Sequence, residues 1–312
     1  MQNQKPTAKI TKSAKTIFTK TMSTKTAFAK TTKSKQNALI LAYKPAFITS
    51  NAFLGKIKRK YGLVKAGFSG TLDPFAQGSL LIASGAYTKL LPFINTEPKR
   101  YEAVLWLGAK SKSLDIENFL SVESVPKFSQ SQIDKVLQNL CGNITYTPPS
   151  FSAKKISGKR AYTLARSGEE VNLAQNTMSV YSLEILRYNH PFLHFSSEVS
   201  KGSYVRSLGE LIAQNLGVSG VLSALKRTKE GDLCAKKGVE IFLNPLEVLP
   251  FGRLELDSHF EDLIKNGAKI CIKNAKSGIF IVQFSEFFSI IEILKDGNIK
   301  YLCNRILYAD TL

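Results

Sequence analysis

The spacing of apolar residues predicts strands in several segments of the chain. "ALILAY" at 38–43 is a short apolar run bounded by polar residues, and "YEAVLWLG" at 101–108 has strand composition and alternation. "VYSLEILRY" at 180–188 and "FLHFSSEVS" at 192–200 alternate apolar and polar positions. We therefore expect four strands in these segments, the last two with one face buried.

Other segments have the spacing of helices. "SNAFLGKIKRKY" at 50–61 predicts a helix capped by Ser50 and stopped by Gly62. Apolar residues at helical spacing also predict a helix at 129–141, closed by Gly142, and another after "KGS" up to Gly217. A further helix is expected in "PFAQGSLLIA" at 74–83, because an aspartate followed by proline is a common helix start. Interleaved strands and helices indicate an α/β or α+β body.

Composition changes at two places and divides the chain into three parts. Residues 1–36 are a low-complexity Lys/Thr/Ser/Ala segment, which we interpret as a disordered basic tail. A transit peptide is a second interpretation, although such peptides favour arginine and this segment has none. Prolines and glycines cluster in "NPLEVLPFG", so residues 37–250 are expected to form the main domain. Residues 251–312 read as a small, mostly β module, with strand-like runs that include "AKICI" at 268–272.

The formal charge of +19 changes the picture from a generic globular protein to one with a polyanionic partner. The first 36 residues hold nine lysines and no acid, and the remainder still carries +10. A folded body with that excess favours RNA or DNA, whose phosphates a basic tail can also contact. Solubility alone is the simpler alternative.

Cysteine, histidine and hydropathy patterns narrow the class further. The four cysteines form no C-x-x-C pair, and the three histidines have no metal-ligand spacing with them, so no metal site is expected. Scattered thiols are typical of a reducing cytoplasm. The longest apolar stretch is interrupted by Gln283, Glu286 and Glu292, which predicts strands and a soluble protein without a membrane span.

One acidic residue stands out in this basic chain. Fifteen lysines and arginines precede Asp73, which is the first carboxylate, in "SGTLDPFAQGSLLIASG". On the local pattern alone, a helix cap is the favoured role of Asp73. A reactive group within a basic surface is the alternative.

The wider set of motifs is similar to a known family. "AGFSGTLDPFAQGSLLIASGAYTKL" resembles the signature of the TruB-type tRNA pseudouridine synthases around their catalytic aspartate. Further blocks of the resemblance follow the same order and cover most of residues 37–250: "YKP", "KRYEAVLWLG", "PPSFSAKKISGKRAYTLARSGEEV", "SKGSYVRSLGELIAQNLG" and "LKR".

The resemblance implies a fold and a reaction. The expected fold is a central, largely antiparallel sheet flanked by helices, and the C-terminal module would be a reduced RNA-binding PUA-like domain. The expected reaction turns uridine 55 in the T loop of tRNA into pseudouridine, with neither cofactor nor metal, in a cytoplasmic and monomeric enzyme. The uridine must be flipped out of its stack, which costs roughly a few kcal/mol.

The resemblance also assigns residues. Asp73 matches the nucleophile, a role compatible with capping if the turn faces the pocket. Arg206 matches the arginine that pairs with this aspartate, with phosphate binding as the alternative. Tyr101 matches the tyrosine that packs against the target base and accepts the proton from C5; a simple β-strand tyrosine is the alternative.

Several positions are expected to bind RNA. Tyr204 and Leu225 match residues that line the uracil pocket, and Lys44 matches one near the site, where a structural role is equally plausible. Phe68 replaces the histidine common in the family, and we expect it to stack on bases. The basic stretches 56–60 and 154–160 are expected to contact phosphates, and an RNA-clamping insertion is expected around 145–170.

Two other functions fit the same motifs. One is a guide-RNA-dependent pseudouridine synthase subunit, which shares the G-T-L-D-P signature but works in a larger ribonucleoprotein. The other is a non-catalytic RNA-binding or tRNA-folding protein on the same scaffold. The combination of Asp73, Tyr101 and Arg206 favours an enzyme, because a carboxylate that faces RNA weakens binding.

Overall fold

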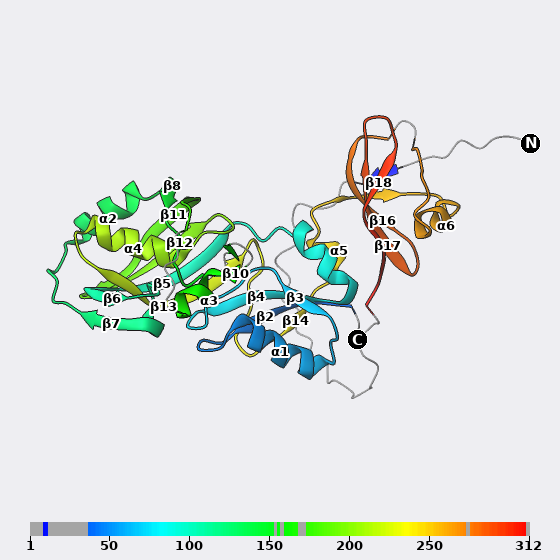
Figure 1. The fold of residues 1–312 in the computed structure, drawn as a ribbon. Coiled ribbons are helices and arrows are strands. Elements are labelled where there is room, and N and C mark those ends of the chain that lie inside the picture. Colours follow the sequence, from blue (N-terminus) through cyan, green and yellow to red (C-terminus); the bar gives the residue numbers. More distant parts are fainter. Residues whose placement is uncertain are drawn as a thin grey trace, which may run out of the picture.

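A computed structural model describes residues 9–11, 37–152, 155–156, 159–167, 173–272 and 275–309. Its main feature is a nine-stranded sheet in the order β14-β2-β4-β13-β5-β12-β11-β8, with β3 paired to β4 (Figure 1). The strands of this sheet are β2 (Ala38–Lys44), β3 (Ala66–Phe68), β4 (Gln77–Ser84), β5 (Lys99–Leu107), β8 (Gly142–Tyr146), β11 (Asn176–Asn189), β12 (Phe192–Val199), β13 (Gly220–Glu230) and β14 (Ile241–Phe242).

Most neighbouring strands are antiparallel, which confirms the predicted sheet type. The exception is the parallel pairing of β13 with β4, which is limited to Lys226 opposite Gln77 and Arg227 opposite Gly78. This short seam joins the two halves of the sheet. It also brings the segment that follows Asp73 next to β13.

The predicted helix at 74–83 is wrong, because residues 77–84 form strand β4. The run 80–83 is buried on both faces: Leu80 and Ile82 belong to one apolar cluster, and Leu81 and Ala83 to another. A central strand covered on both sides reads as a continuous apolar run rather than an alternating one. Tertiary packing therefore outweighs the Asp-Pro helix-start signal, and Asp73 lies in a turn in which the Ala76 N–H donates to the Asp73 carbonyl at 3.1 Å.

Helix α1 (Ser50–Tyr61) covers the β2–β4 half of the sheet, with Phe53 and Ile57 buried against it. Gly62 ends the helix with φ of 64°, as predicted, but the N-cap is Thr49 rather than Ser50. The Ser50 hydroxyl is used elsewhere, since it bonds to both backbone groups of Leu72.

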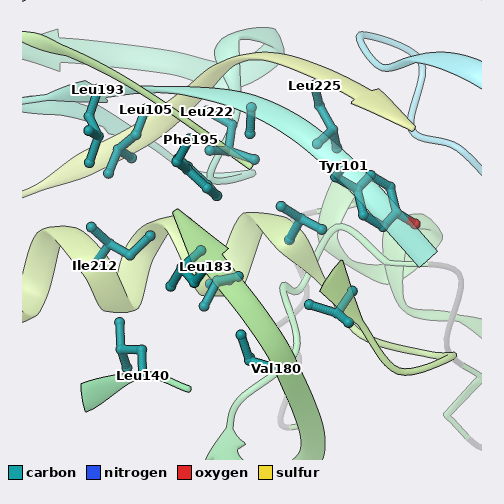
Figure 2. Close-up of a cluster of buried hydrophobic side chains, with 14 of the residues drawn as sticks. Tyr101, Leu105, Leu140, Val180, Leu183, Leu193, Phe195, Ile212, Leu222 and Leu225 are labelled. Atoms are coloured by element: carbon teal, nitrogen blue, oxygen red, sulfur yellow. The ribbon is translucent and has the colours of Figure 1, made fainter. Parts of the chain in front are cut away.

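Helices α2 (Gln130–Asn139) and α4 (Val205–Asn215) cover the other half of the sheet. Both were predicted, although Gly142 begins β8 rather than closing α2. Figure 2 shows the core between α4 and the sheet, in which leucines of β5, β12 and β13 pack with Phe195 and Tyr101. Tyr101 lies at one end of this cluster, with its hydroxyl directed away from the leucines.

Shorter elements connect these layers. They are η1 (Gly85–Phe93), β6 (Ala109–Ser111), η2 (Ile116–Asn118), β7 (Phe119–Val122), β9 (Lys155–Ile156), β10 (Lys159–Arg160), α3 (Ala161–Arg166) and α5 (Pro245–Val248).

The C-terminal part is a second sheet in the order β1-β15-β16-β17-β18. Its elements are β1 (Lys9–Thr11), β15 (Gly252–Glu255), α6 (Phe260–Lys265), β16 (Gly278–Gln283), β17 (Phe287–Ile293) and β18 (Ile299–Leu307). Several strands thus lie in this part of the chain, but "AKICI" contributes only an isolated bridge at Cys271. The sheet lies beside β2 and η1 (Figure 1), and Ile281, Phe288 and Ile290 share a cluster with Leu39 and Leu81.

Strand β1 comes from the segment that we interpreted as a disordered tail. Residues 9–11 pair antiparallel with β15, a contact that the low-complexity sequence does not predict. The rest of residues 1–36 lies outside the described part of the chain, so the disorder prediction is not tested there. No helix in the described ranges has the length and apolar character needed to cross a membrane.

Gly78 is expected to be essential for the seam. A Cβ at this position would lie 2.1 Å from the Arg227 carbonyl oxygen, and the φ of 120° is unfavourable for any other residue. We expect Gly78→Ala to lower the free energy of unfolding by about 3 kcal/mol or more, measured by urea denaturation.

The matched control is Gly217→Ala, where φ is 76° and no atom lies within 4 Å of the added methyl group. That variant should lose only about 1 kcal/mol, from the left-handed backbone alone. Equal losses in the two variants would show that close strand packing at Gly78 is unimportant.

Candidate active site

The loop that carries Asp73 is fixed from three directions. Leu72 and Phe75 are buried in the core shared with α4, and Ser50 of α1 bonds to the backbone of Leu72 at 2.8 and 2.9 Å. The Lys44 ammonium donates to the Pro74 carbonyl at 3.3 Å. These contacts hold the Asp73 backbone while its side chain stays 31% exposed.

The structure places Arg206 against Asp73, as the resemblance implies. The Asp73 Oδ1 accepts a hydrogen bond from Nη2 at 3.0 Å, and Oδ2 lies 2.9 Å from Nε. Arg206 lies in the first turn of α4 and is only 3% exposed. Its remaining donors bind the carbonyls of Ser113 at 2.6 Å and Phe151 at 2.9 Å. The guanidinium therefore holds the Asp73 carboxylate in a fixed position from one side, and part of the carboxylate stays exposed to solvent.

Asp115 is a second carboxylate on the same guanidinium, and the sequence analysis missed it. Its Oδ2 lies 3.2 Å from Arg206 Nη1, while Oδ1 accepts from the Ser113 hydroxyl at 2.6 Å and the Glu117 N–H at 2.9 Å. Burial raises the pKa of Asp115, and Ser113 and Arg206 act in the opposite direction. Arg206 is thus held between one buried and one half-exposed acid.

Tyr101 lies on β5 between Ser197 of β12 and Arg227 of β13 in the strand register. Its side chain is buried at the end of the core shown in Figure 2. Burial raises the pKa of the phenol, and the Arg227 guanidinium, which hydrogen bonds to it, acts in the opposite direction.

A second buried charge network lies behind Tyr101 and was also missed. Glu230 Oε1 binds Lys99 at 2.8 Å and Arg227 at 3.1 Å, and Oε2 accepts from the Ser69 hydroxyl at 2.8 Å. Burial favours neutral Glu230, but Arg227 and Lys99 outweigh it and lower the pKa of the carboxyl. Arg227 also binds the Gly70 carbonyl at 3.1 Å. The network therefore joins the start of the Asp73 loop to β5 and β13.

Lys44 is fully buried, and it holds backbone groups near Asp73. Its ammonium donates to the carbonyls of Pro45 at 3.0 Å and Ile48 at 2.6 Å, in addition to Pro74. Burial lowers the pKa of Lys44 to about 8, and Asp73 opposes this shift. The side chain thus contributes positive charge at neutral pH without being exposed to a ligand.

The other predicted pocket residues occupy different positions. Tyr204 is half-buried at the N-cap of α4, two residues before Arg206, and its ring lies 6.3 Å from that of Tyr146. Leu225 is buried on β13, opposite Ala103 of β5 and therefore two residues along that strand from Tyr101. Phe68 on β3 packs against the apolar cluster under α1, which leaves it partly exposed.

The predicted RNA-binding segments are described only in part. In the stretch 56–60, Lys56 and Arg59 are exposed, whereas Lys60 forms an ion pair with Glu240 at 2.9 Å. The predicted insertion around 145–170 contains β9, β10 and α3, but residues 153–154, 157–158 and 168–170 lie outside the described part. Among the described residues, no group of three or more His, Cys, Asp or Glu side chains is placed to hold a metal ion.

The Glu230 network is expected to be important for stability. Glu230→Gln leaves two buried cations without a charged partner, so the free energy of unfolding at pH 7 should fall by about 3 kcal/mol. Because the folded pKa is lowered, this stabilisation is present above the unfolded value and is lost as pH falls through the folded value. The difference between wild type and variant, measured by urea denaturation, should therefore shrink below about pH 4.

The control is Glu240→Gln, which removes the surface pair with Lys60 and should cost less than about 1 kcal/mol at any pH. A Glu230 variant as stable as this control would contradict the buried network.

Known proteins are similar to this chain over most of its length. The family model described as "TruB family pseudouridylate synthase (N terminal domain)" matches residues 58–205. A "tRNA pseudouridine synthase B" of Helicobacter hepaticus is 52% identical over 274 residues, which cover 88% of this chain and 96% of that protein. A relative of the same name from a Sulfurovum species is 47% identical over 277 residues, which cover 86% and 97%.

A solved structure supports the fold. The structure described as "H/ACA RNP bound to a substrate RNA containing 2'-deoxyuridine" superimposes with a TM-score of 0.61 at 18% identity, and the match covers 98% of this chain and 96% of that one. Membership of a family is shown by the two relatives, because their similarity to this chain extends over nearly their whole length. The chain belongs to the TruB family of pseudouridylate synthases.

Proposed function

We propose that this protein isomerises uridine to pseudouridine in tRNA, with Asp73 as the nucleophile. The observation that carries the proposal is the Asp73 carboxylate, held on one side by a buried guanidinium and exposed on the other. An RNA-binding protein gains nothing from a fixed, exposed carboxylate, because it repels phosphates. Relatives at 52% and 47% identity carry the name tRNA pseudouridine synthase B.

The reaction requires little beyond positioning and proton transfer. The bond between ribose C1′ and uracil N1 breaks, the base turns, and a bond forms between C1′ and C5. The C5 hydrogen leaves as a proton, and N1 gains one, so the product is an isomer of the substrate. A carboxylate nucleophile divides this exchange into two easier steps. Arg206 keeps the attacking oxygens in place and balances their charge.

We assign two roles to Tyr101: its ring packs against the uracil base, and its oxygen accepts the proton from C5. Its ring is held between β12 and β13 in the same layer as Leu225, which suits packing against uracil. Proton removal requires phenolate character, which burial opposes and the Arg227 guanidinium favours. Arg227 is therefore the cation that would stabilise the Tyr101 phenolate before it accepts the C5 proton.

The substrate is proposed to be uridine 55 in the T arm, flipped into the pocket by a monomeric, cytoplasmic enzyme. Tyr204 lies two residues before Arg206 at the start of α4, and Leu225 on β13 lies opposite Ala103 of the strand that carries Tyr101. We assign both to the walls of the uracil pocket. Phe68 is assigned to stacking, and the exposed Lys56 and Arg59 to phosphates of the arm.

The test uses unmodified tRNA with tritium at C5 of its uridines. Wild-type protein should release tritium to water, Asp73→Asn should release none, and both should bind tRNA within about threefold of each other, since a single carboxylate contributes no phosphate contact. Tyr101→Phe keeps the ring and loses the hydroxyl, so it should bind normally and release tritium at least about 100-fold more slowly. Asp257→Asn, on the exposed surface of the C-terminal part, is the matched control and should behave as wild type.

Release by Asp73→Asn at the wild-type rate would show that another group is the nucleophile. Full activity of Tyr101→Phe would restrict Tyr101 to packing. Binding without release by the wild-type protein would favour the non-catalytic alternative, or a guide-RNA-dependent subunit if added guide RNA restores release.

A further inference from the structure

Phe47 combines two unfavourable features. Its φ of 61° lies in the left-handed region, where a bulky residue is uncommon and costs free energy. Its side chain is 75% exposed, the highest value among the large apolar residues that the structure records as exposed. An exposed apolar side chain alone needs no explanation. An aromatic residue in a strained conformation that also leaves most of its side chain exposed does need an explanation, because a glycine would be more stable at that position.

The loop around Phe47 is held in place rather than free to relax. The Lys44 ammonium donates to the carbonyls of Pro45 and Ile48, on either side of Phe47. Directly afterwards, the Thr49 hydroxyl caps α1 by accepting from the Ala52 N–H at 3.0 Å, and Ser50 bonds to Leu72. Strained backbone that neighbouring contacts enforce in this way is concentrated at functional sites.

The position of the loop connects Phe47 to the active site. The same Lys44 ammonium that binds Ile48 also binds Pro74, the residue after Asp73. A second strained residue, Leu114 with φ of 60°, lies beside Asp115 on the other side of Arg206. Both strained loops thus flank the candidate nucleophile. Of these two residues, Phe47 is the exposed aromatic one, and it lies three residues before α1, which carries the exposed Lys56 and Arg59.

We propose that Phe47 is a stacking platform for an unpaired base of the tRNA arm, outside the pocket that takes the target uridine. A flat, exposed apolar ring suits a nucleobase, whose π-face stacks on it, while cations further along α1 can contact phosphates of the same RNA strand. Stacking with RNA would offset the strain that the free protein carries. The proposal rests on the proposed function and adds a binding residue to it.

The test measures tRNA affinity for a graded series at Phe47. Phe47→Ala and Phe47→Leu should weaken binding about tenfold or more, whereas Phe47→Tyr and Phe47→Trp should stay within about threefold of wild type. The salt dependence of the dissociation constant should not change, because no phosphate contact is lost. Phe47→Gly should bind as weakly as Phe47→Ala yet melt no lower than wild type, since glycine accepts the left-handed backbone.

Two further measurements make the test direct. Phe192→Ala is the matched control: this exposed aromatic lies opposite Trp106, five residues along β5 from Tyr101, and should leave affinity unchanged. The chain has a single tryptophan, so Phe47→Trp in a Trp106→Phe background places the protein's one tryptophan at the proposed platform, where it can be excited selectively. Addition of tRNA should quench its fluorescence.

The outcomes separate this proposal from the proposed function. Wild-type affinity in Phe47→Ala, equal affinity in Phe47→Leu and Phe47→Trp, or no quenching with bound tRNA would each overturn the stacking role. Tritium release by wild-type protein in the same preparations tests the enzyme activity independently. Active wild type with an unaffected Phe47→Ala variant would reject the platform alone, whereas quenching without release would keep the platform and reject the activity.

Discussion

The buried Arg206 guanidinium is the constraint on which the rest of the site depends. A cation that is 3% exposed needs partners for its charge and its donors, and this chain supplies Asp73, Asp115 and two backbone carbonyls. These partners come from loops that follow β6, precede β4 and precede β9, whereas Arg206 itself lies on α4. Burying one arginine therefore fixes three separate loops around a single carboxylate.

On the opposite side of the site a buried anion, rather than a buried cation, gathers partners of opposite charge. There a buried acid, Glu230, gathers Lys99, Arg227 and Ser69. Arg206 therefore fixes the side chain of Asp73, while the Glu230 network fixes the start of its loop and the surroundings of Tyr101. The Asp73 loop links the two networks, because Arg206 binds Asp73 and Arg227 binds the Gly70 carbonyl. Arg227 lies in the seam between β4 and β13, which close packing at Gly78 makes possible. Such preorganisation suits a reaction whose main demand is the correct placement of a base.

Local patterns predicted the elements whose packing is one-sided and also β2, a short apolar run that is buried on both faces. Strands β5 and β12 alternate because one face meets the helices, and α1 ends at Gly62 because glycine accepts the left-handed backbone. The prediction failed at β4, where burial on both faces removes the alternation and the preceding Asp-Pro pair imitates a helix start. Asp115 and Glu230 could not be found from spacing, since both look like ordinary surface acids until strands distant in sequence bury them. The motif resemblance supplied Asp73 and Arg206, which the structure places in contact.

The most direct test of this account is the single-turnover rate of Arg206→Lys with saturating tRNA. Lysine keeps the positive charge but cannot reproduce the planar fork that contacts both acids and both carbonyls. If the geometry of the guanidinium organises the site, the rate should fall at least about 100-fold while tRNA affinity changes little. A variant that folds, binds tRNA and reacts at the wild-type rate would show that charge alone is sufficient, and would contradict the central role of Arg206.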